Sequence, residues 1–473
     1  MGYNGRVLKK IRLKNFKLHE DTSIEASRIN VFIGPNNSGK SSVFQALLAL
    51  QQASAGQNRT HLISTFQREK TDENQPYLYP SHRYPKAVVE LGEFADVTRG
   101  GSGEMQIGLE AEMPASSSHD VALIQAGPIR VSFDLSFRDN QLAAHEGRLS
   151  CALGEVDWGW RRETGGVPDV KMPIGGPVSL GFRLTDNFSL LQPAGKYGTG
   201  TTSDEIAERA VAIESGRDSG LTDLQIASLQ RNLADAPAQA LRSLRYIPPL
   251  RGFEEAAYPT TQFPGTENLD RLALSDRSVA LTNLLAANAR LRTQISDLLK
   301  SLVKVGMEFE TAPSHRVKVW ATSASSGRPE TLFVNEGSGA SQLPFILVPI
   351  ALAVAGDTIL LSEPEAHLHP KRQSDLTSMI LTVFKFSEGH LQFFIETHSE
   401  HVLHRLLHAV AKGELNRDDL TIYYFPEPKE GKADPRKLVI DDKGGVEGGL
   451  PGFFDQSLDE LSEYLEALKQ PKA

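Results

Sequence analysis

A glycine-containing loop near the start of the chain carries the clearest chemistry in the sequence. The segment GPNNSGKSS begins at Gly34 and matches the pattern G-x-x-x-x-G-K-[ST] at Gly39, Lys40 and Ser41. Glycines let backbone N–H groups converge on a phosphate chain, a lysine ammonium adds positive charge, and a serine hydroxyl can bind Mg²⁺. We expect Lys40 to be exposed to solvent when no nucleotide is bound. The loop predicts a site for a nucleoside triphosphate.

Three polar segments in the C-terminal half of the chain could complete such a site. GSGASQ, beginning at Gly337, precedes an apolar helix, so it is either a plain helix cap or a second N-terminus able to hold phosphate. LLSEPEAHLHP places Glu363 just after an apolar strand, where a carboxylate can hold Mg²⁺ and position water. FFIETHS places His398 after another strand, either as a capping residue or against the γ-phosphate. Together the four segments indicate a nucleotide-dependent enzyme.

The elements that position these segments can be read from hydrophobic periodicity. The apolar strand Ile29–Ile33 runs into the loop, and apolar residues at helical spacing follow it, which gives strand, loop and helix in succession. Between residues 85 and 195, short alternating strands separated by turn residues predict an antiparallel β layer. Residues 204–245 and 268–305 have a helical period without a long heptad array. We therefore expect a nucleotide-binding core with β and helical insertions.

Composition and charge limit the class of protein. The 473 residues are 40% hydrophobic and 23% charged, as in folded globular proteins. The net charge of -9 gives no global attraction to nucleic acid, although the strand KKIRLKNFKL is either a local cationic face or simply a solvated one. The single cysteine, Cys151, is typical of a reducing compartment, and the apolar run at 343–356 is too short to span a membrane. We expect a cytoplasmic protein with no membrane partner.

The four segments carry a family resemblance. Their order, GPNNSGKSS, GSGASQ, LLSEPEAHLHP and ETHS, resembles the ABC-type ATPase heads of the RecF, OLD and SMC kind, often classed as AAA family ATPases. The resemblance covers residues 6–60 and 315–455 and returns at VELGEFADV and YIPPLRG. It implies an α/β fold, namely a P-loop NTPase head whose mixed sheet carries an antiparallel β layer, plus helical insertions.

The resemblance also implies a division of the chain. The parts are an N-terminal head segment with Walker A and the β layer (1–200), a helical insertion (201–310), a C-terminal head segment with the signature, Walker B and switch histidine (311–425), and a tail domain (426–473). The tail segment VEGGLPGFFDQSL is similar to an uncharacterised domain ending in PxGFFD that closes a subset of these ATPases. In those proteins a tryptophan usually stands where this chain has Leu450.

Carried over by position, the resemblance implies ATP and Mg²⁺ as cofactors and assigns the site residues. The Walker A contacts are Asn36, Asn37, Ser38, Gly39, Lys40, Ser41 and Ser42, and the signature contacts are Gly337, Gly339, Ser341 and Gln342. Glu363 is the catalytic carboxylate and His398 the switch histidine, while His367, His369 and Pro370 belong to a loop that meets the partner subunit. The Q-loop is expected near Phe94 and Asp96.

One position departs from the family pattern. Ser362 stands where these ATPases have an acidic residue that serves Mg²⁺, so the expected metal residues are Ser41, Ser362 and Glu363. Either Ser362 holds a metal-bound water through a weaker field, or the register slips so that Glu363 takes the metal and Glu365 serves as base. Both alternatives predict slow ATP hydrolysis.

The resemblance further implies partners and a setting. Since the signature of such heads cannot reach its own P-loop, we expect a homodimer or higher homo-oligomer that closes on ATP. Too few residues follow ETHS for a Toprim nuclease, so we expect a separate effector such as a nuclease, in anti-phage defence of the PARIS or Septu kind. The alternatives are a RecF-like DNA-binding ATPase of DNA repair and an ATP-locked scaffold with little turnover.

Overall fold

The computed structural model of the chain describes residues 7–55, 62, 91–113, 121–166, 168–175, 178–194, 221–260, 274–312, 315–323, 325 and 329–449. Some predicted segments lie outside these residues. They are the start of the range 85–195 in which alternating strands are expected, the first parts of the two helical stretches, and the tail from residue 450 onward.

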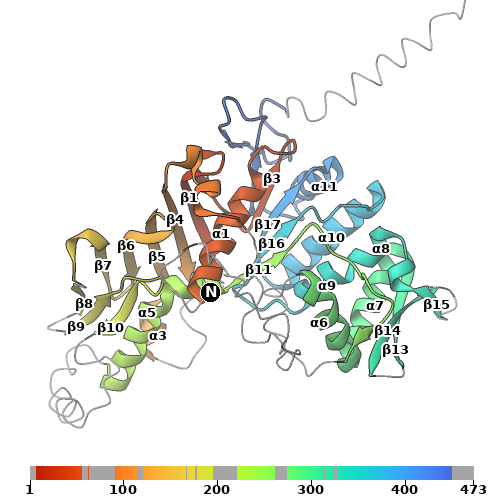
Figure 1. Ribbon diagram of the computed structural model, residues 1–473, viewed down its shortest axis with the longest axis horizontal. Coiled ribbons are helices and arrows are strands. Elements are labelled where there is room, and N and C mark those ends of the chain that lie inside the picture. The colour runs from red at the N-terminus through yellow and green to blue at the C-terminus, as the bar shows by residue number, and fades with distance from the viewer. Residues whose placement is uncertain are drawn as a thin grey trace, which may run out of the picture.

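A mostly parallel sheet lies at the centre of the molecule (Figure 1). Its order is β11 (Leu244–Ile247), β16 (Thr358–Ser362), β17 (Gln392–Thr397), β3 (Ile29–Ile33), β18 (Leu420–Tyr424) and the short antiparallel β19 (Arg436–Lys437). Strands β16, β17 and β3 are buried along their whole length, as expected for parallel strands covered on both faces. Parallel strands end at one edge of a sheet, so the polar segments that follow β3, β16 and β17 meet there.

The predicted antiparallel layer lies beside this sheet. It is six-stranded, in the order β2 (His19–Glu25), β1 (Val7–Phe16), β4 (Glu104–Met113), β5 (Ile129–Arg138), β6 (Gln141–Cys151) and β7 (Gly154–Arg161). A three-stranded sheet continues it with β8 (Asp169–Gly175), β9 (Val178–Leu184) and β10 (Leu191–Ala194). In β5 buried residues alternate with more exposed ones, since one face packs on the core.

One cation of the N-terminal strand is paired with carboxylates of the same sheet. The Arg12 guanidinium donates to Asp134 at 2.9 Å and also to the Glu110 carboxylate, on the neighbouring strands β5 and β4. Exposed cross-strand pairs such as Arg130–Glu112 and Arg148–Asp157 line the same sheet. Among the cations of KKIRLKNFKL, Arg12 is thus balanced by two carboxylates.

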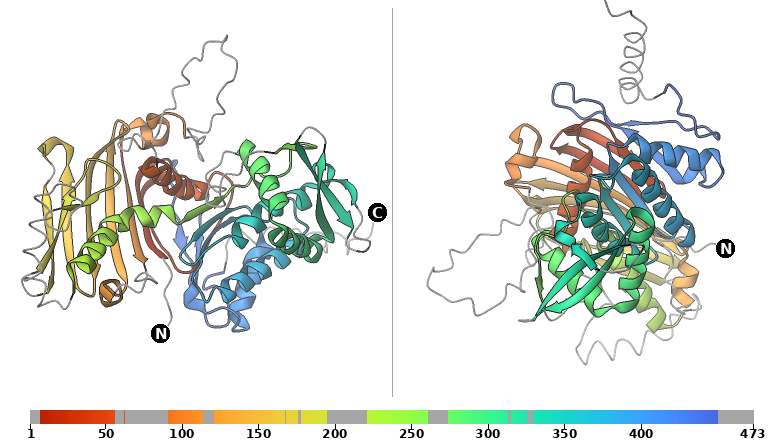
Figure 2. Two further views of the ribbon diagram at one scale, coloured as in Figure 1. Left: turned by 90° about the horizontal axis from the view of Figure 1, so that it is seen from below. Right: turned by 90° about the vertical axis from the view of Figure 1, so that its right-hand side faces the viewer.

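Helices lie on both sides of the parallel sheet. On the antiparallel side are α1 (Lys40–Ala55), α2 (Phe94–Val97), α3 (Val121–Ala126) and α5 (Asp223–Arg242). On the other side are α6 (Leu274–Ala287), α7 (Ala289–Val303), α8 (Ser338–Gln342), α9 (Pro344–Ala351), α10 (Pro370–Phe386) and α11 (Glu400–Ala411). A further sheet packs against α6 and α7 (Figure 2). It consists of β12 (Tyr258–Pro259), β13 (Val305–Ala312), β14 (Arg316–Ser323) and β15 (Pro329–Leu332). No helix in the described ranges is both long and apolar enough to cross a membrane.

The parallel sheet divides the apolar interior into two cores. Phe32 of β3 faces the first core, where its ring lies 5.8 Å from that of Phe44 in α1, whereas its neighbours Val31 and Ile33 face the second. The first core lies between α1, α5 and the antiparallel sheet. The second core contains apolar residues of α6, α7, α9, α10 and α11. The alternation of side chains along each strand therefore fixes both layers against one sheet.

The α/β architecture and the antiparallel layer are as predicted, but the range 201–310 is not helical throughout. Helix α5 ends at Arg242, and Leu244–Ile247 form β11, which pairs in parallel with β16. Leu244 and Ile247 are buried, and Arg245 forms an ion pair with Asp357. A strand this short, directly after a helix, does not interrupt a helical hydrophobic period, which is why the sequence pattern extended the helix to residue 245.

Candidate nucleotide site

The loop between β3 and α1 has a backbone path that requires glycine. A Cβ on Gly34 would lie 2.1 Å from the carbonyl oxygen of Phe425, so no larger residue fits there. Gly39 has a φ of 99°, in the region that favours glycine. His19 holds the loop from the other side, with Nε2 3.0 Å from the Gly39 carbonyl and Nδ1 3.0 Å from Thr22 Oγ1. The loop is thus fixed by the segments on either side of it.

Lys40 is buried, contrary to the expectation that it is exposed. The residue is only 3% exposed. Its Nζ donates hydrogen bonds to the carbonyls of Gly34 at 3.0 Å and Pro35 at 2.6 Å, and to Ser38 Oγ at 3.3 Å. The reason is that an ammonium has three donors, and the tight loop places three acceptors around it. Burial lowers the pKa of Lys40, whereas the nearby carboxylates, Glu396 foremost, raise it.

The other Walker A residues divide between the surface and the interior. Asn36 and Asn37 are exposed at the tip of the loop, whereas Ser38 is buried and donates to the Pro35 carbonyl at 2.8 Å. Ser42 is also buried, in the first turn of α1, while Ser41 is exposed. Of the two serines that follow Lys40, Ser41 therefore presents its hydroxyl at the surface of the site.

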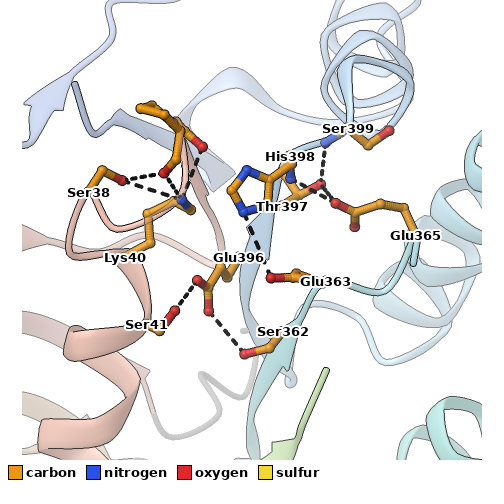
Figure 3. A network of polar contacts seen from close by, with 12 residues as sticks. Ser38, Lys40, Ser41, Ser362, Glu363, Glu365, Glu396, Thr397, His398 and Ser399 are labelled. Carbon is orange, nitrogen blue, oxygen red and sulfur yellow. Dashed lines mark hydrogen bonds and ion pairs between the residues drawn. The ribbon is translucent and has the colours of Figure 1, made fainter. Parts of the chain in front are cut away.

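A buried glutamate connects the loop to the neighbouring strands (Figure 3). Glu396, at the end of β17, accepts a hydrogen bond from the Ser41 hydroxyl and another from Ser362 Oγ at 3.1 Å. It is 3% exposed, and burial raises the pKa of its carboxyl group, while the bond from Ser41 and the charge of Lys40 lower it. The carboxylate next to the P-loop serine therefore comes from β17, which lies between β3 and β16.

Glu363 and His398 lie together on the open side of the site. His398 Nε2 is 3.8 Å from Glu363 Oε1, and both side chains are partly exposed. Burial lowers the pKa of His398, as does the charge of Lys40, whereas Glu363 and a hydrogen bond to the Gly34 backbone raise it. Glu363 has a φ of 44°, and its N–H donates to the Glu396 carbonyl at 2.8 Å. The motifs predicted to meet thus converge on one point.

Glu365 has a different environment from Glu363. Its Oε1 accepts hydrogen bonds from Thr397 Oγ1 and the His398 N–H, both at 2.7 Å, and burial raises the pKa of its carboxyl group. The glutamate therefore shapes the turn after β17. This position does not favour the slipped register in which Glu365 would be the base.

The signature segment packs against the loop after β16 and lies apart from the P-loop of its own chain (Figure 1). Ser341 Oγ accepts a hydrogen bond from the Phe253 N–H at 3.1 Å, and the Gln342 amide donates to the Ala366 carbonyl. A Cβ on Gly339 would lie 2.7 Å from the His367 carbonyl, whereas one on Gly337 would meet nothing within 4 Å. Ser341 and Gln342 are thus used within the chain, and Gly337 is exposed together with its neighbour Ser338.

Sequence reasoning missed two residues of the site, Glu396 and Arg251. The Arg251 guanidinium donates to the backbone carbonyls of Ser362 at 3.0 Å and Glu363 at 2.8 Å, and burial lowers its pKa to about 10. It lies in YIPPLRG, whose resemblance to the family was noted without a role for its arginine. A strand-end carboxylate in ETHS was the available signal for Glu396.

Two remaining expectations concern contacts outside the P-loop. His367, His369 and Pro370 are exposed, as a loop that meets a partner must be. Asp96 accepts a hydrogen bond from the Glu93 N–H at the start of α2, and Phe94 is buried in the first core. The placement of the Q-loop at these two residues stays a prediction.

Comparison with known proteins agrees with this geometry. The sequence matches the AAA ATPase domain family over residues 7–111 and 266–403, which together exceed half of the chain and include the P-loop, Glu363 and His398. A search of the curated proteins found no match.

Three solved structures are among those to which the chain is similar. An Smc head bound to the C-terminal winged-helix domain of ScpA has a TM-score of 0.42 at 11% identity, covering 92% of this chain and 98% of that one. The SMC head domain from Thermotoga maritima has a TM-score of 0.37 at 13% identity, covering 92% and 99%. The recombination mediator RecF has a TM-score of 0.35 at 9% identity, covering 91% and 98%. By the extent of the family match, the chain belongs to the AAA ATPase domain family.

Proposed function

We propose that this chain binds ATP with Mg²⁺ at the P-loop and hydrolyses it slowly, and that the nucleotide state controls its assembly. The observation that carries the proposal is the convergence of Lys40, Ser41, Glu363 and His398 at one edge of the parallel sheet. These groups derive from distant parts of the chain, and each matches a step of phosphoryl transfer.

Binding would use the groups already arranged around the loop. The Lys40 ammonium would exchange its bonds to the Gly34 and Pro35 carbonyls for phosphate oxygens. Magnesium fits the oxygen donors present, because the exposed Ser41 hydroxyl stands beside a carboxylate. The ion would neutralise charge on the phosphates when bound. The Ser41 hydroxyl would hold the ion.

Hydrolysis would depend on Glu363 and His398. The Glu363 carboxylate is partly exposed at the open side of the site, where it can accept a proton from an attacking water. His398 lies between this carboxylate and the loop, so it can orient the γ-phosphate. We expect turnover below the typical enzyme median of about 10 per second, because the neutral Ser362 stands where the family pattern has an acidic residue that serves Mg²⁺. The signature segment lies apart from the P-loop of its own chain, so one chain does not complete the site.

The same separation supports a head-to-tail homodimer. Gly337, Ser338 and His367 are exposed, and α8, which begins at Ser338, lies on the far side of β16 from α1 (Figure 1). A second protomer could present these residues to the P-loop and enclose ATP between the two chains. ATP contacting both protomers would stabilise the closed state by its differential affinity, and hydrolysis would release it.

We propose an effector, such as a nuclease in anti-phage defence, as the partner that reads this assembly. A RecF-like role in binding duplex DNA is the second candidate. The paired charges around Arg12 favour the first, because the strand expected to supply a cationic face has carboxylates beside its arginine.

The proposal is tested by measuring phosphate release and molar mass with and without ATP and Mg²⁺. We expect slow phosphate release and an ATP-dependent increase in mass by light scattering. A protein that binds no ATP in calorimetry would refute the nucleotide assignment. Salt-dependent binding of duplex DNA would favour the second candidate, and bound ATP without phosphate release would favour the ATP-locked scaffold.

A further inference from the structure

We propose that Glu396 supplies the acidic group beside the Mg²⁺ of the bound nucleotide, the charge that the family pattern places at Ser362. The proposal rests on the proposed ATPase function and assigns its metal side to a residue on another strand. In this chain the carboxylate would stand on β17, at Glu396, and not on β16, where the family pattern has it.

Glu396 lies between Ser41 of the P-loop and Ser362 at the end of β16. One carboxylate oxygen accepts from the Ser41 hydroxyl and the other accepts from Ser362 Oγ at 3.1 Å. The strand register sets this arrangement, because Ser362 is opposite Glu396 on β17, and Glu396 is opposite Phe32 on β3. The neutral Ser362 thus donates a hydrogen bond to Glu396, the carboxylate that would supply the charge of the family's acidic residue.

The hydrogen bond from Ser41 gives the carboxylate a definite task. A serine that donates its proton to Glu396 directs its oxygen lone pairs away from that group, toward a metal ion on the phosphate side. Partners of this kind, outside the direct ligands, orient a ligand and raise its basicity. Glu396 would therefore position Ser41 and add a negative charge near the ion.

The other carboxylates nearby are committed elsewhere. Glu365 accepts from Thr397 and the His398 backbone, and Glu363 lies beside the His398 ring. Among the carboxylates that raise the pKa of Lys40, Glu396 has the largest effect. The residue best placed to act on both the lysine and the metal side of the loop is Glu396.

The test compares Glu396→Gln with the double variant Ser362→Asp/Glu396→Gln. Calorimetry would measure the Kd for ATP in EDTA and over a Mg²⁺ series, and electron paramagnetic resonance would follow Mn²⁺ bound with a non-hydrolysable ATP analogue. We expect Glu396→Gln to bind ATP normally in EDTA but to need at least about tenfold more Mg²⁺ for the same gain in affinity, since one unit charge is lost near the ion. The double variant should recover the Mg²⁺ midpoint.

Two further variants make the result specific. Ser362→Asp alone should raise the Mg²⁺ requirement, because it places a second carboxylate against Glu396. Glu365→Gln removes another buried carboxyl group and should leave the Mg²⁺ midpoint unchanged. A wild-type midpoint in Glu396→Gln, or a double variant no better than Glu396→Gln, would overturn the proposal. If the wild-type chain binds no ATP in either condition, the proposed function fails, and the role of Glu396 fails with it.

Discussion

Replacing Lys40 with alanine should abolish ATP binding and also destabilise the fold. The second effect follows from the burial of the ammonium, which is bonded to the carbonyls of Gly34 and Pro35. A buried acceptor left unsatisfied costs about 1–3 kcal/mol. Because the variant leaves both carbonyls without this donor, the free energy of unfolding should fall by about 2 kcal/mol or more. That loss corresponds to a fall in Tm of several degrees.

The effect on ATP is larger because the missing group is charged. A hydrogen bond to a charged group contributes about 1.5–3 kcal/mol, and the ammonium reaches both the β- and γ-phosphates in the proposed complex. We expect the Kd for ATP to rise by at least about 100-fold. Calorimetry gives the Kd and thermal denaturation without nucleotide gives the Tm.

Lys17→Ala is the matched control. Lys17 is a partly buried lysine on the turn between β1 and β2, and its Nζ donates to Gln45 at 2.6 Å. Its loss should leave the Kd for ATP unchanged. A Lys40→Ala protein with wild-type affinity would refute the nucleotide site, and one with an unchanged Tm would refute the reasoning from burial.

Three other changes test separate parts of the site. Glu363→Gln keeps the size of the side chain but removes the base, so ATP should bind and light scattering should show a persistent dimer or larger assembly. Equal association of the wild type and the variant in the presence of ATP would exclude nucleotide-gated closure. Arg251→Met removes the donors that hold the Glu363 backbone, so the rate of phosphate release should fall about tenfold or more with little change in the Kd for ATP, and an equal loss in both would show a merely structural role. Burial lowers the pKa of His19 to about 4, so protonation favours the unfolded chain and stability should fall as the pH drops from 6.5 toward 4, by up to about 3 kcal/mol. Urea denaturation of His19→Gln should show a flatter pH dependence in that window than the exposed control His401→Gln, and parallel curves for the two would contradict the assignment.

The parts of the site that could be predicted were those set by local sequence. The strand Ile29–Ile33, the glycines of the loop and the start of α1 follow from periodicity and backbone conformation within one short segment. The ends of β16 and β17 were predicted for the same reason. Each of these needs only neighbours along the chain.

The parts that were missed depend on which strands are neighbours. Nothing in a single segment states that β17 lies between β3 and β16, and this order alone puts Glu396 against Ser41. The loop that surrounds Lys40 likewise packs against Phe425, a residue distant from it in the sequence. Arg251 could not be placed because β11, the strand before it, was read as helix.

The loop at residues 248–253 makes two contacts that would couple the two nucleotide sites of the proposed dimer. Arg251 in this loop holds the Glu363 backbone, and Phe253 donates to Ser341 in α8. In the proposed dimer, Glu363 serves the nucleotide of its own chain, whereas α8 faces the nucleotide of the other. A shift of α8 on meeting one ATP would therefore reach the carboxylate that acts on the second ATP. Coupling of binding between two sites is reciprocal, so each ATP should alter the affinity for the other by the same factor.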